Sequence, residues 1–333
     1  LPGMRTGASG LILHGAGRTA QPRTVRRLGG LALTLALAVS GTARAEGACA
    51  GLAPGEDRPV RDLAYAAPEP GAPAAVHLLD LWPGATPLPA PLVVFVHGGT
   101  WMYGGKYAGT PAQARAFRKA GYAYATLNYR LRRHGPPQAA AADIAEAVAF
   151  LRREAPGCGL DPDRIILMGH SAGAHLAALV ALDESYLTAA GVPPEVVRAV
   201  VLLDAYGLDI ARHVRESGDP VYARVFGAEP MGWTAMSPVS HAGSGRRPPP
   251  TILHVAAGNP ETAGQAEALA SALRAAGGEA EVHEAQGESH NSLNYGFGAE
   301  DDATTRLTLD FLSARVRNAP DLSSPSPTVL NPP

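Results

Sequence analysis

The stretch Arg164-Ile-Ile-Leu-Met-Gly-His-Ser-Ala-Gly-Ala-His-Leu-Ala177 decides how this chain is interpreted. Its first part, Arg164–Met168, is apolar along most of its length, as is typical of a strand buried on both faces of a parallel sheet. From Ala172 onward the sequence is rich in alanine and leucine and favours a helix. Gly169-His170-Ser171-Ala172-Gly173 lies between the two. The stretch therefore predicts a strand, a sharp turn and a helix, with Ser171 held out at the end of the strand.

The same alternation extends on both sides of this stretch. Short β-type runs alternate with helical patterns from about residue 60 to residue 316, which predicts an α/β fold with a mostly parallel sheet and helices on both faces. The expected strands are Arg61–Tyr65, Val76–Leu81, Leu92–Val96, Tyr122–Leu127, Arg164–Met168, Arg198–Asp204, Thr251–Ala256 and Glu279–Glu284.

Two segments break the alternation. Residues 211–250 carry mixed charge, glycine-rich turns and a run of prolines, and we expect them to cross the strand ends as a partial lid. The tail 319–333 is rich in proline and serine without an apolar period, so we expect it to be disordered. The chain is then divided into a leader (1–45), one domain (46–318) and this tail.

The leader differs from the rest of the chain in charge. Residues 1–45 hold six arginines and no acidic residue, although the whole chain has a net charge of -2. The remaining residues therefore carry about -8, because they hold all 30 Asp and Glu against 22 of the 28 Lys and Arg. An acidic body argues against nucleic acid or anionic lipid as a partner.

The leader also has the three parts of a secretory signal peptide. Arginines precede the apolar run Leu28–Val39, and Ala43-Arg44-Ala45 offers a small-residue cleavage site. The apolar run is shorter than the roughly 20 residues that span a bilayer. We expect cleavage after Ala45, a periplasmic or secreted protein, and no stable membrane insertion after cleavage.

Export bears on the two cysteines, Cys49 and Cys158. An oxidising compartment permits a disulfide between them. The sequence leaves open whether they form one or remain separate thiols. Two cysteines without clustered histidines argue against a structural zinc site, so no metal is expected.

Two glycine-rich motifs predict nucleophilic chemistry. Ser171 has the setting of a nucleophile elbow, because the glycines around it let the backbone turn without Cβ clashes. His97-Gly98-Gly99-Thr100-Trp101 follows the expected strand Leu92–Val96 and would bring backbone N–H groups close to a substrate oxygen. Such oxyanion donors contribute strongly to acyl-transfer catalysis, each worth about 3 kcal/mol. The expected donors are the amides of Gly98, Gly99, Thr100 and Ala172. The same motif leaves Trp101 open as either a substrate contact or a core residue.

A serine hydroxyl needs a base to remove its proton. His290, in Gly287-Glu288-Ser289-His290-Asn291, follows the last expected strand and precedes the final helix. Among the eleven histidines it has the best position for this role. His97 is interpreted as a structural residue that braces its own loop.

With these motifs the sequence resembles α/β-hydrolase esterases related to hormone-sensitive lipase, to kynurenine formamidase and to the bacterial feruloyl-esterase-like group. The resemblance covers about residues 59–316 and includes Gln265 in a late helix and the Ser289-His290-Asn291 run. It implies an eight-stranded sheet, a Ser-His-acid triad, and hydrolysis of a carboxylic ester or related acyl bond without a cofactor.

The triad acid departs from the family pattern. The acid usually follows the next-to-last strand as Asp-Pro or Glu-x-Pro, but here that loop contains Asn259-Pro260-Glu261. We expect Glu261 to orient His290, with Asp209 and Asp204 as alternatives near the end of the preceding strand. If no carboxylate reaches His290, activity should be low.

The leading hypothesis is therefore an exported serine hydrolase that cleaves small-molecule carboxylic esters through an acyl-enzyme intermediate. The sequence keeps two alternatives open. One is an amidase, arylformamidase or peptidase of the same fold, and the other is a degenerate hydrolase that only binds, because fold does not fix function. The natural ester and the oligomeric state are not indicated.

Overall fold

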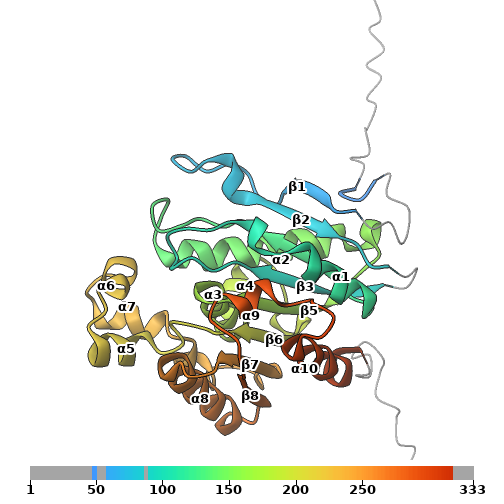
Figure 1. Cartoon of the computed structure of the whole chain (residues 1–333). Helices are drawn as coiled ribbons and strands as arrows, with labels where there is room; N and C mark the ends of the chain where they lie inside the picture. The colour runs from blue at the N-terminus through green and yellow to red at the C-terminus, as the bar shows by residue number, and fades with distance from the viewer. Residues whose placement is uncertain (1–46, 51–57, 86–88, 318–333) are drawn as a thin grey trace, which may run out of the picture. The chain divides into compact units, whose positions relative to one another are not determined.

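The structure, a computed structural model, describes residues 47–50, 58–85 and 89–317. Eight strands of this part form one sheet in the order β1-β2-β4-β3-β5-β6-β7-β8 (Figure 1). β2 runs antiparallel to both of its neighbours, and every other neighbouring pair is parallel. The strands are β1 Val60–Ala64, β2 Leu78–Trp82, β3 Ala90–Val96, β4 Ala123–Leu127, β5 Leu160–His170, β6 Val197–Leu203, β7 Thr251–Ala256 and β8 Ala280–Ala285. All eight expected strands are present, with ends shifted by a few residues.

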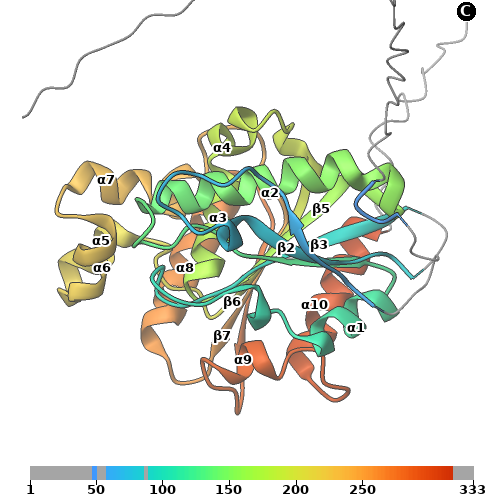
Figure 2. The ribbon, with the colours of Figure 1, turned by 90° about the horizontal axis from the view of Figure 1, so that it is seen from above.

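Helices cover both faces of the sheet, as expected. They are α1 Pro111–Lys119, α2 Pro137–Cys158, α3 Ala172–Leu182, α4 Glu184–Ala189, α5 Ile210–Ser217, α6 Pro220–Phe226, α7 Pro230–Ala235, α8 Pro260–Ala275, α9 Ser292–Tyr295 and α10 Ala303–Leu312. Helices α2, α3 and α8 share one apolar layer with the sheet, whereas α1 and α10 share the other. Seen from above, α2 and α1 lie on opposite sides of the sheet (Figure 2). The central strand β3 is buried along its whole length because both faces are covered.

Local signals explain where several helices begin and end. Thr110 forms a capping box with Gln113 at the start of α1, and Pro111 takes the first helical position, where its missing N–H is not needed. Gly159 ends α2 in the left-handed region, with φ 64°. The capping box at Thr110 thus fixes the end of the long loop that follows β3.

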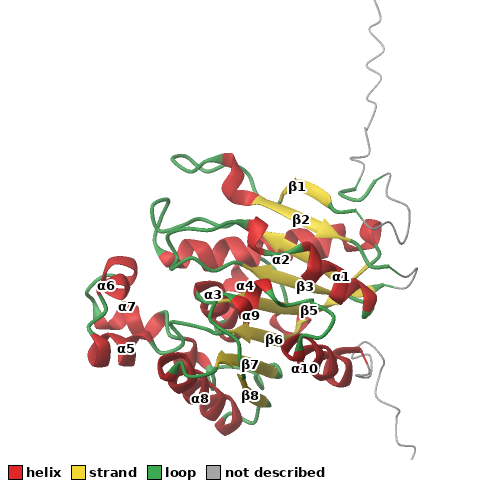
Figure 3. Cartoon of the chain, viewed as in Figure 1, coloured by secondary structure: helices red, strands yellow, loops and turns green. Residues whose placement is uncertain are grey.

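Residues 211–250 form three short helices, α5, α6 and α7, followed by a 3-10 turn at Pro238–His241. The three helices stand together at one end of the sheet in both views (Figures 1 and 2). Coloured by secondary structure, they form a separate helical group joined to the sheet by loops (Figure 3). We refer to α5–α7 as the helical insert; its role as a partial lid stays a prediction.

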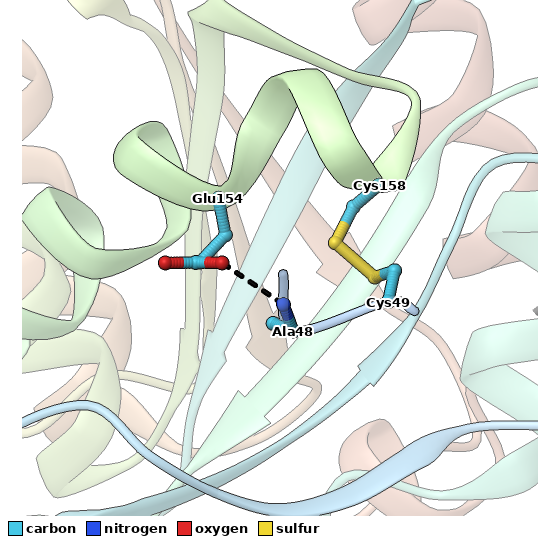
Figure 4. The surroundings of a disulfide bond; sticks show 4 residues. All are labelled: Ala48, Cys49, Glu154 and Cys158. Atoms are coloured by element: carbon cyan, nitrogen blue, oxygen red, sulfur yellow. Dashed lines mark hydrogen bonds between the residues drawn. A yellow bond between two sulfur atoms is a disulfide. The ribbon is translucent and has the colours of Figure 1, made fainter. Parts of the chain in front are cut away.

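Cys49 and Cys158 form a disulfide, with their Cα atoms 5.2 Å apart (Figure 4). Beside it, the Ala48 N–H donates to Glu154 Oε2 at 2.9 Å. The two cysteines are therefore paired, and the bond attaches the start of the described chain to the end of α2. The expected leader (1–45) and tail (319–333) lie outside the described residues. Among the helices that are described, none has the length and apolar character needed to cross a membrane.

Candidate active site

Ser171 occupies a strained turn between β5 and α3. Its φ of 56° and ψ of -125° lie in a region that costs a non-glycine residue about 1–3 kcal/mol. The flanking glycines make this turn feasible. A Cβ at Gly173 would lie 2.1 Å from the Val96 carbonyl oxygen, and a Cβ at Gly169 would lie 2.3 Å from that of Gly173. Only glycine fits at both positions, and this holds Ser171 out at the end of the strand.

His290 lies in the loop between β8 and α9, and its Nδ1 is 2.7 Å from Asp204 Oδ2. Asp204 directly follows β6 and is completely buried. The register pairs His170 of β5 with Leu203 of β6, so Ser171 and Asp204 are next to each other at the carboxyl edge of the sheet. An ionised carboxylate can only accept, so the proton lies on Nδ1 and the lone pair on Nε2.

The second oxygen of Asp204 is also held. Its Oδ1 accepts from Thr262 Oγ1 at 2.7 Å and from the Ala256 N–H at 3.0 Å. Burial alone would raise the pKa of Asp204, but the hydrogen bonds from His290, Thr262 and Ala256 outweigh it and lower the pKa. Asp204 is therefore ionised and fixed in orientation.

The expectation that Glu261 contacts His290 is wrong. Glu261 lies in the first turn of α8, and its Oε1 is 3.2 Å from Nδ1 of His213 in the helical insert. Asn259, the residue before the proline, caps α8 by accepting from the Thr262 N–H. The other alternative, Asp209, caps α5 in the same manner. Asn259, Glu261 and Asp209 therefore all lie at the starts of helices. Asp204 is the carboxylate that contacts the imidazole of His290.

The loop after β3 approaches Ser171 closely. A Cβ at Gly98 would lie 3.0 Å from Ser171 Cβ, so a side chain there would collide with the serine. Gly99, Thr100 and Trp101 follow with φ of 120°, 51° and 60°, and the Gly99 carbonyl accepts from two N–H groups further along the chain. Within the described part of the chain, the backbone N–H groups of the four expected oxyanion donors donate to no other group. These donors are Gly98, Gly99, Thr100 and Ala172. This loop is called the glycine loop below.

His97 braces the glycine loop from below. Its ring stacks on Tyr129 with centroids 4.2 Å apart, and Tyr129 Oη donates to the His97 carbonyl at 2.7 Å. Burial lowers the pKa of His97 to about 4, so the ring is neutral near pH 7. It has the structural setting that the sequence indicated.

Trp101 joins the glycine loop to both α3 and the helical insert. Its Nε1–H donates to Nδ1 of the fully buried His175 at 3.0 Å, and His175 Nε2–H donates to the Met236 carbonyl at 2.7 Å. The rings of Tyr222 and Phe226 of α6 pack against the indole in T-shaped arrangements. Trp101 is thus a core residue, and His175 is a bracing residue that the sequence did not indicate.

His170 holds the loop of His290. Its Nε2–H donates to the His290 carbonyl at 2.8 Å, and the two ring centroids are 4.5 Å apart. Burial, aided by the neighbouring His290, lowers the pKa of His170 to about 4. A neutral ring keeps Nε2 as a defined donor to that carbonyl.

Across the described residues, no group of three or more His, Cys, Asp and Glu side chains is arranged to hold a metal.

Gln265 supports the loop after Asp204. Its Oε1 accepts from the N–H groups of Gly207 and Leu208, each at 2.9 Å. The side chain therefore ties α8 to the residues that follow the acid, which accounts for a buried glutamine in this helix.

Known proteins resemble this chain in sequence or in fold. Esterase LipQ of Mycobacterium tuberculosis (strain ATCC 25618 / H37Rv) is 28% identical over 254 residues, which span 71% of this chain and 59% of LipQ. A truncated carbohydrate esterase from gut microbiota has the same fold, with a TM-score of 0.65 at 18% identity over 80% of this chain and 99% of its own. The esterase Est2 of the planctomycete Thermogutta terrifontis matches with a TM-score of 0.57 at 25% identity, over 71% of this chain and 86% of Est2.

These relatives identify the fold as that of the α/β-hydrolases. The BD-FAE family model matches residues 79–273, more than half of the chain. That range contains the glycine loop, Ser171, Asp204 and Thr262. The chain therefore belongs to the BD-FAE family.

Proposed function

We propose that this protein is a serine esterase that hydrolyses carboxylic esters with Ser171 as nucleophile, His290 as base and Asp204 as the residue that orients the base. The observation that carries the proposal is the 2.7 Å contact between His290 Nδ1 and the buried, multiply hydrogen-bonded Asp204, at the same sheet edge as the strained Ser171. The esterases LipQ and Est2 support the same reaction class.

The geometry supports a two-step acyl transfer. Ser171 Oγ attacks the acyl carbonyl and transfers its proton to His290 Nε2, and the tetrahedral oxyanion accepts from amides of the glycine loop and of Ala172. His290 then protonates the leaving alcohol, leaving an acyl-serine. In the second step, His290 removes a proton from a water molecule, whose oxygen attacks the acyl carbonyl. His290 then returns the proton to Ser171 Oγ as the acyl bond breaks, and the carboxylic acid is released. Asp204 stays ionised throughout and stabilises the imidazolium.

A catalytically degenerate binding protein is the weaker hypothesis for this site. The sequence-based reason for it was the irregular loop around Asn259-Pro260-Glu261, which offered no regular acid. Asp204 supplies a carboxylate from another loop, with three hydrogen-bond donors that hold it in place. That reason therefore no longer applies.

Export to the periplasm or the cell exterior is part of the proposal. The leader pattern within residues 1–45 supports it, and the Cys49–Cys158 disulfide suits an oxidising compartment. N-terminal sequencing of secreted material should give Glu46 as the first residue. An N-terminus that retains the arginine-rich segment would contradict this part of the proposal.

Covalent labelling tests the nucleophile. Est2 has also been solved phosphorylated by paraoxon, so a fluorophosphonate probe is a suitable reagent for this chain. We expect wild-type protein to be labelled and to hydrolyse p-nitrophenyl butyrate, and Ser171→Ala to do neither. Exposed Ser244, changed to alanine, is the matched control and should behave as wild type. Absence of labelling and of hydrolysis in folded wild-type protein would overturn the proposal.

A further inference from the structure

A cavity of about 510 Å³ lies beside the glycine loop. Its volume is in the range of small-molecule sites. Its walls come mainly from three segments, namely His97 and 104–109 after β3, 73–82 around β2, and 128–134 after β4, with Arg61 of β1 and Pro111 of α1 completing them. All of these residues are described, and none of them is a catalytic residue or an oxyanion donor in the proposed mechanism; His97 and Tyr129 of the lining brace the glycine loop.

The cavity is close to the nucleophile. Gly104 lines it, and a Cβ at Gly104 would lie 2.5 Å from the Gly98 carbonyl oxygen. A Cβ at Gly98 would in turn lie 3.0 Å from Ser171 Cβ. One layer of main chain therefore separates the cavity wall from Ser171, and a ligand in the cavity would contact the loop that faces the serine.

Much of the lining is apolar or aromatic. Val76, Trp82, Tyr129 and Leu131 contribute to it. Tyr107 also lines the cavity although 77% of its surface is exposed. An exposed tyrosine ring at a cavity wall offers a flat face on which a ligand ring can stack. The lining thus favours a ligand with a ring.

The basic side chains that line the cavity differ in whether they have an acidic partner. Lys106 Nζ is 2.5 Å from Asp80 and 2.9 Å from Asp62, and Arg61 also contacts Asp80, at 3.2 Å. Arg133, by contrast, has no acidic partner among the described residues, and its Nη1–H donates only to the Met102 carbonyl, at 2.9 Å. Arg133 therefore keeps most of its guanidinium donors free for a ligand.

His134 adds a second donor beside Arg133. Its Nδ1 accepts from the Leu131 N–H at 3.3 Å, so the neutral ring carries its proton on Nε2. Both residues line the same cavity. A guanidinium and an imidazole N–H together suit a carboxylate, which accepts on two oxygens.

We propose that this cavity binds a ring-bearing carboxylate, with the carboxylate on Arg133 and His134 and the ring against Tyr107 and Leu131. Two sources share this chemistry. The carboxylate can be a substituent of the ester substrate, or it can be a free acid such as the released product. The assignment of a source rests on the proposed function, whereas the binding itself does not.

Calorimetric titration of the Ser171→Ala protein tests the binding without turnover. Benzoate is the probe and benzamide its uncharged counterpart. We expect benzoate to bind at least tenfold more tightly than benzamide, and Arg133→Gln to remove that preference. Arg133→Lys should recover part of it, because the charge remains while the planar fork is lost.

Arg132→Gln is the matched control. Arg132 is the neighbouring exposed arginine, but its Nε–H donates to the Val225 carbonyl of α6 and it does not line the cavity. This variant should bind benzoate as the parent does. Equal affinities for benzoate and benzamide, or equal losses in the Arg132 and Arg133 variants, would overturn the proposal.

A kinetic comparison assigns the source. Wild type and Arg133→Gln are compared in kcat/KM for 4-acetoxybenzoate and 4-acetoxybenzamide, which differ only in the charged group. An Arg133-dependent preference for 4-acetoxybenzoate assigns the site to the substrate. Arg133-dependent benzoate binding without that preference assigns it to a free acid. If neither ester is hydrolysed although p-nitrophenyl butyrate is, the site is not assigned to the substrate. If p-nitrophenyl butyrate is not hydrolysed either, the proposed function fails while the titration still decides the cavity.

Discussion

Two carboxylate–histidine pairs lie at the same end of the sheet and differ in nearly every respect. In the first, Asp204 is completely buried and lies 2.7 Å from His290. In the second, Glu261 keeps 40% of its side chain exposed and lies 3.2 Å from the buried His213. The fold lowers the pKa of Asp204 but raises that of Glu261.

The difference teaches that hydrogen-bond donors, more than proximity to a histidine, determine whether a carboxylate is poised for catalysis. Asp204 accepts from the Thr262 hydroxyl and the Ala256 N–H besides His290. Burial acts on both carboxylates and raises the pKa, and at Glu261 too little opposes it. Asp204 is therefore fixed and ionised, while Glu261 ties the helical insert to α8.

Removing each charge in turn gives the largest expected difference between the pairs. Asp204→Asn should lower kcat for p-nitrophenyl butyrate by about 10³- to 10⁴-fold, because His290 loses the partner that sets its tautomer. Glu261→Gln should change kcat by less than about twofold, since only the insert contact is altered. The measurement is steady-state kinetics on both folded variants. A larger loss in Glu261→Gln would reverse our assignment.

His175, which pairs with Trp101 and not with a carboxylate, can be compared with the two carboxylate–histidine pairs. Trp101→Phe removes the N–H that His175 accepts and leaves a buried acceptor unpaired. We expect kcat to fall about tenfold with a smaller change in KM, because the loop carrying the oxyanion donors shifts. His213→Phe in the insert is the control, with a change of less than about twofold. Equal effects of both variants would mean that His175 and Trp101 serve stability alone.

The support of Asp204 can be weakened without touching the pair. Thr262→Val is nearly isosteric and removes one hydroxyl donor to Asp204. We expect a three- to tenfold loss in kcat and about 1 kcal/mol in the free energy of unfolding. Thr188→Val, at an exposed position near the end of α4, controls for the change of residue type. Unchanged kcat in Thr262→Val would show that two remaining hydrogen bonds suffice to hold Asp204.

The two carboxylates should respond to pH with opposite signs. The pKa of Asp204 is below its usual 3.8, so its contribution to stability is present above that value and is lost as pH falls through the lower folded pKa. The pKa of Glu261 is above its usual 4.5, so its contribution is present below that value and is lost as pH rises through the folded pKa. The free energy of unfolding in urea should be measured across pH. As pH rises, the wild-type value should increase relative to that of Asp204→Asn and decrease relative to that of Glu261→Gln. The same sign for both variants would contradict this account.

The smallest effect on activity is expected far from both pairs. Replacing Cys49 and Cys158 with serine opens a bond between residues separated by 109 positions, which the chain-entropy model values at about 4–5 kcal/mol. Thermal unfolding should occur at a clearly lower temperature. The ratio of kcat between Asp204→Asn and Glu261→Gln should not change when both are made in this background. A changed ratio would mean that the bond shapes the site.

The sequence predicts the parts of the site that depend on local geometry. Ser171 and the glycine loop are recognised because close backbone packing excludes any residue larger than glycine at Gly98 and Gly173. The strands are recognised because burial on both faces requires continuous apolar runs. The position of His290 follows from its place after β8.

The acid could not be chosen from the sequence because it depends on strand register. Asp204 reaches His290 only because β6 pairs with β5 so that Leu203 lies beside His170. A signal was present, since Asp204 ends an otherwise apolar strand, but a strand end and a helix cap look alike in sequence. The brace formed by His175 and Trp101 also depends on contacts distant in the chain.

The most direct test of the central claim is the hydrogen bond between His290 and Asp204 itself. Proton NMR of wild type, Asp204→Asn and Glu261→Gln should be compared for the Nδ1–H resonance of His290, assigned by its loss in His290→Ala. A strong hydrogen bond to a buried carboxylate shifts this proton far downfield. We predict the resonance in wild type and Glu261→Gln and its loss in Asp204→Asn. A resonance that persists in Asp204→Asn and disappears in Glu261→Gln would contradict the account.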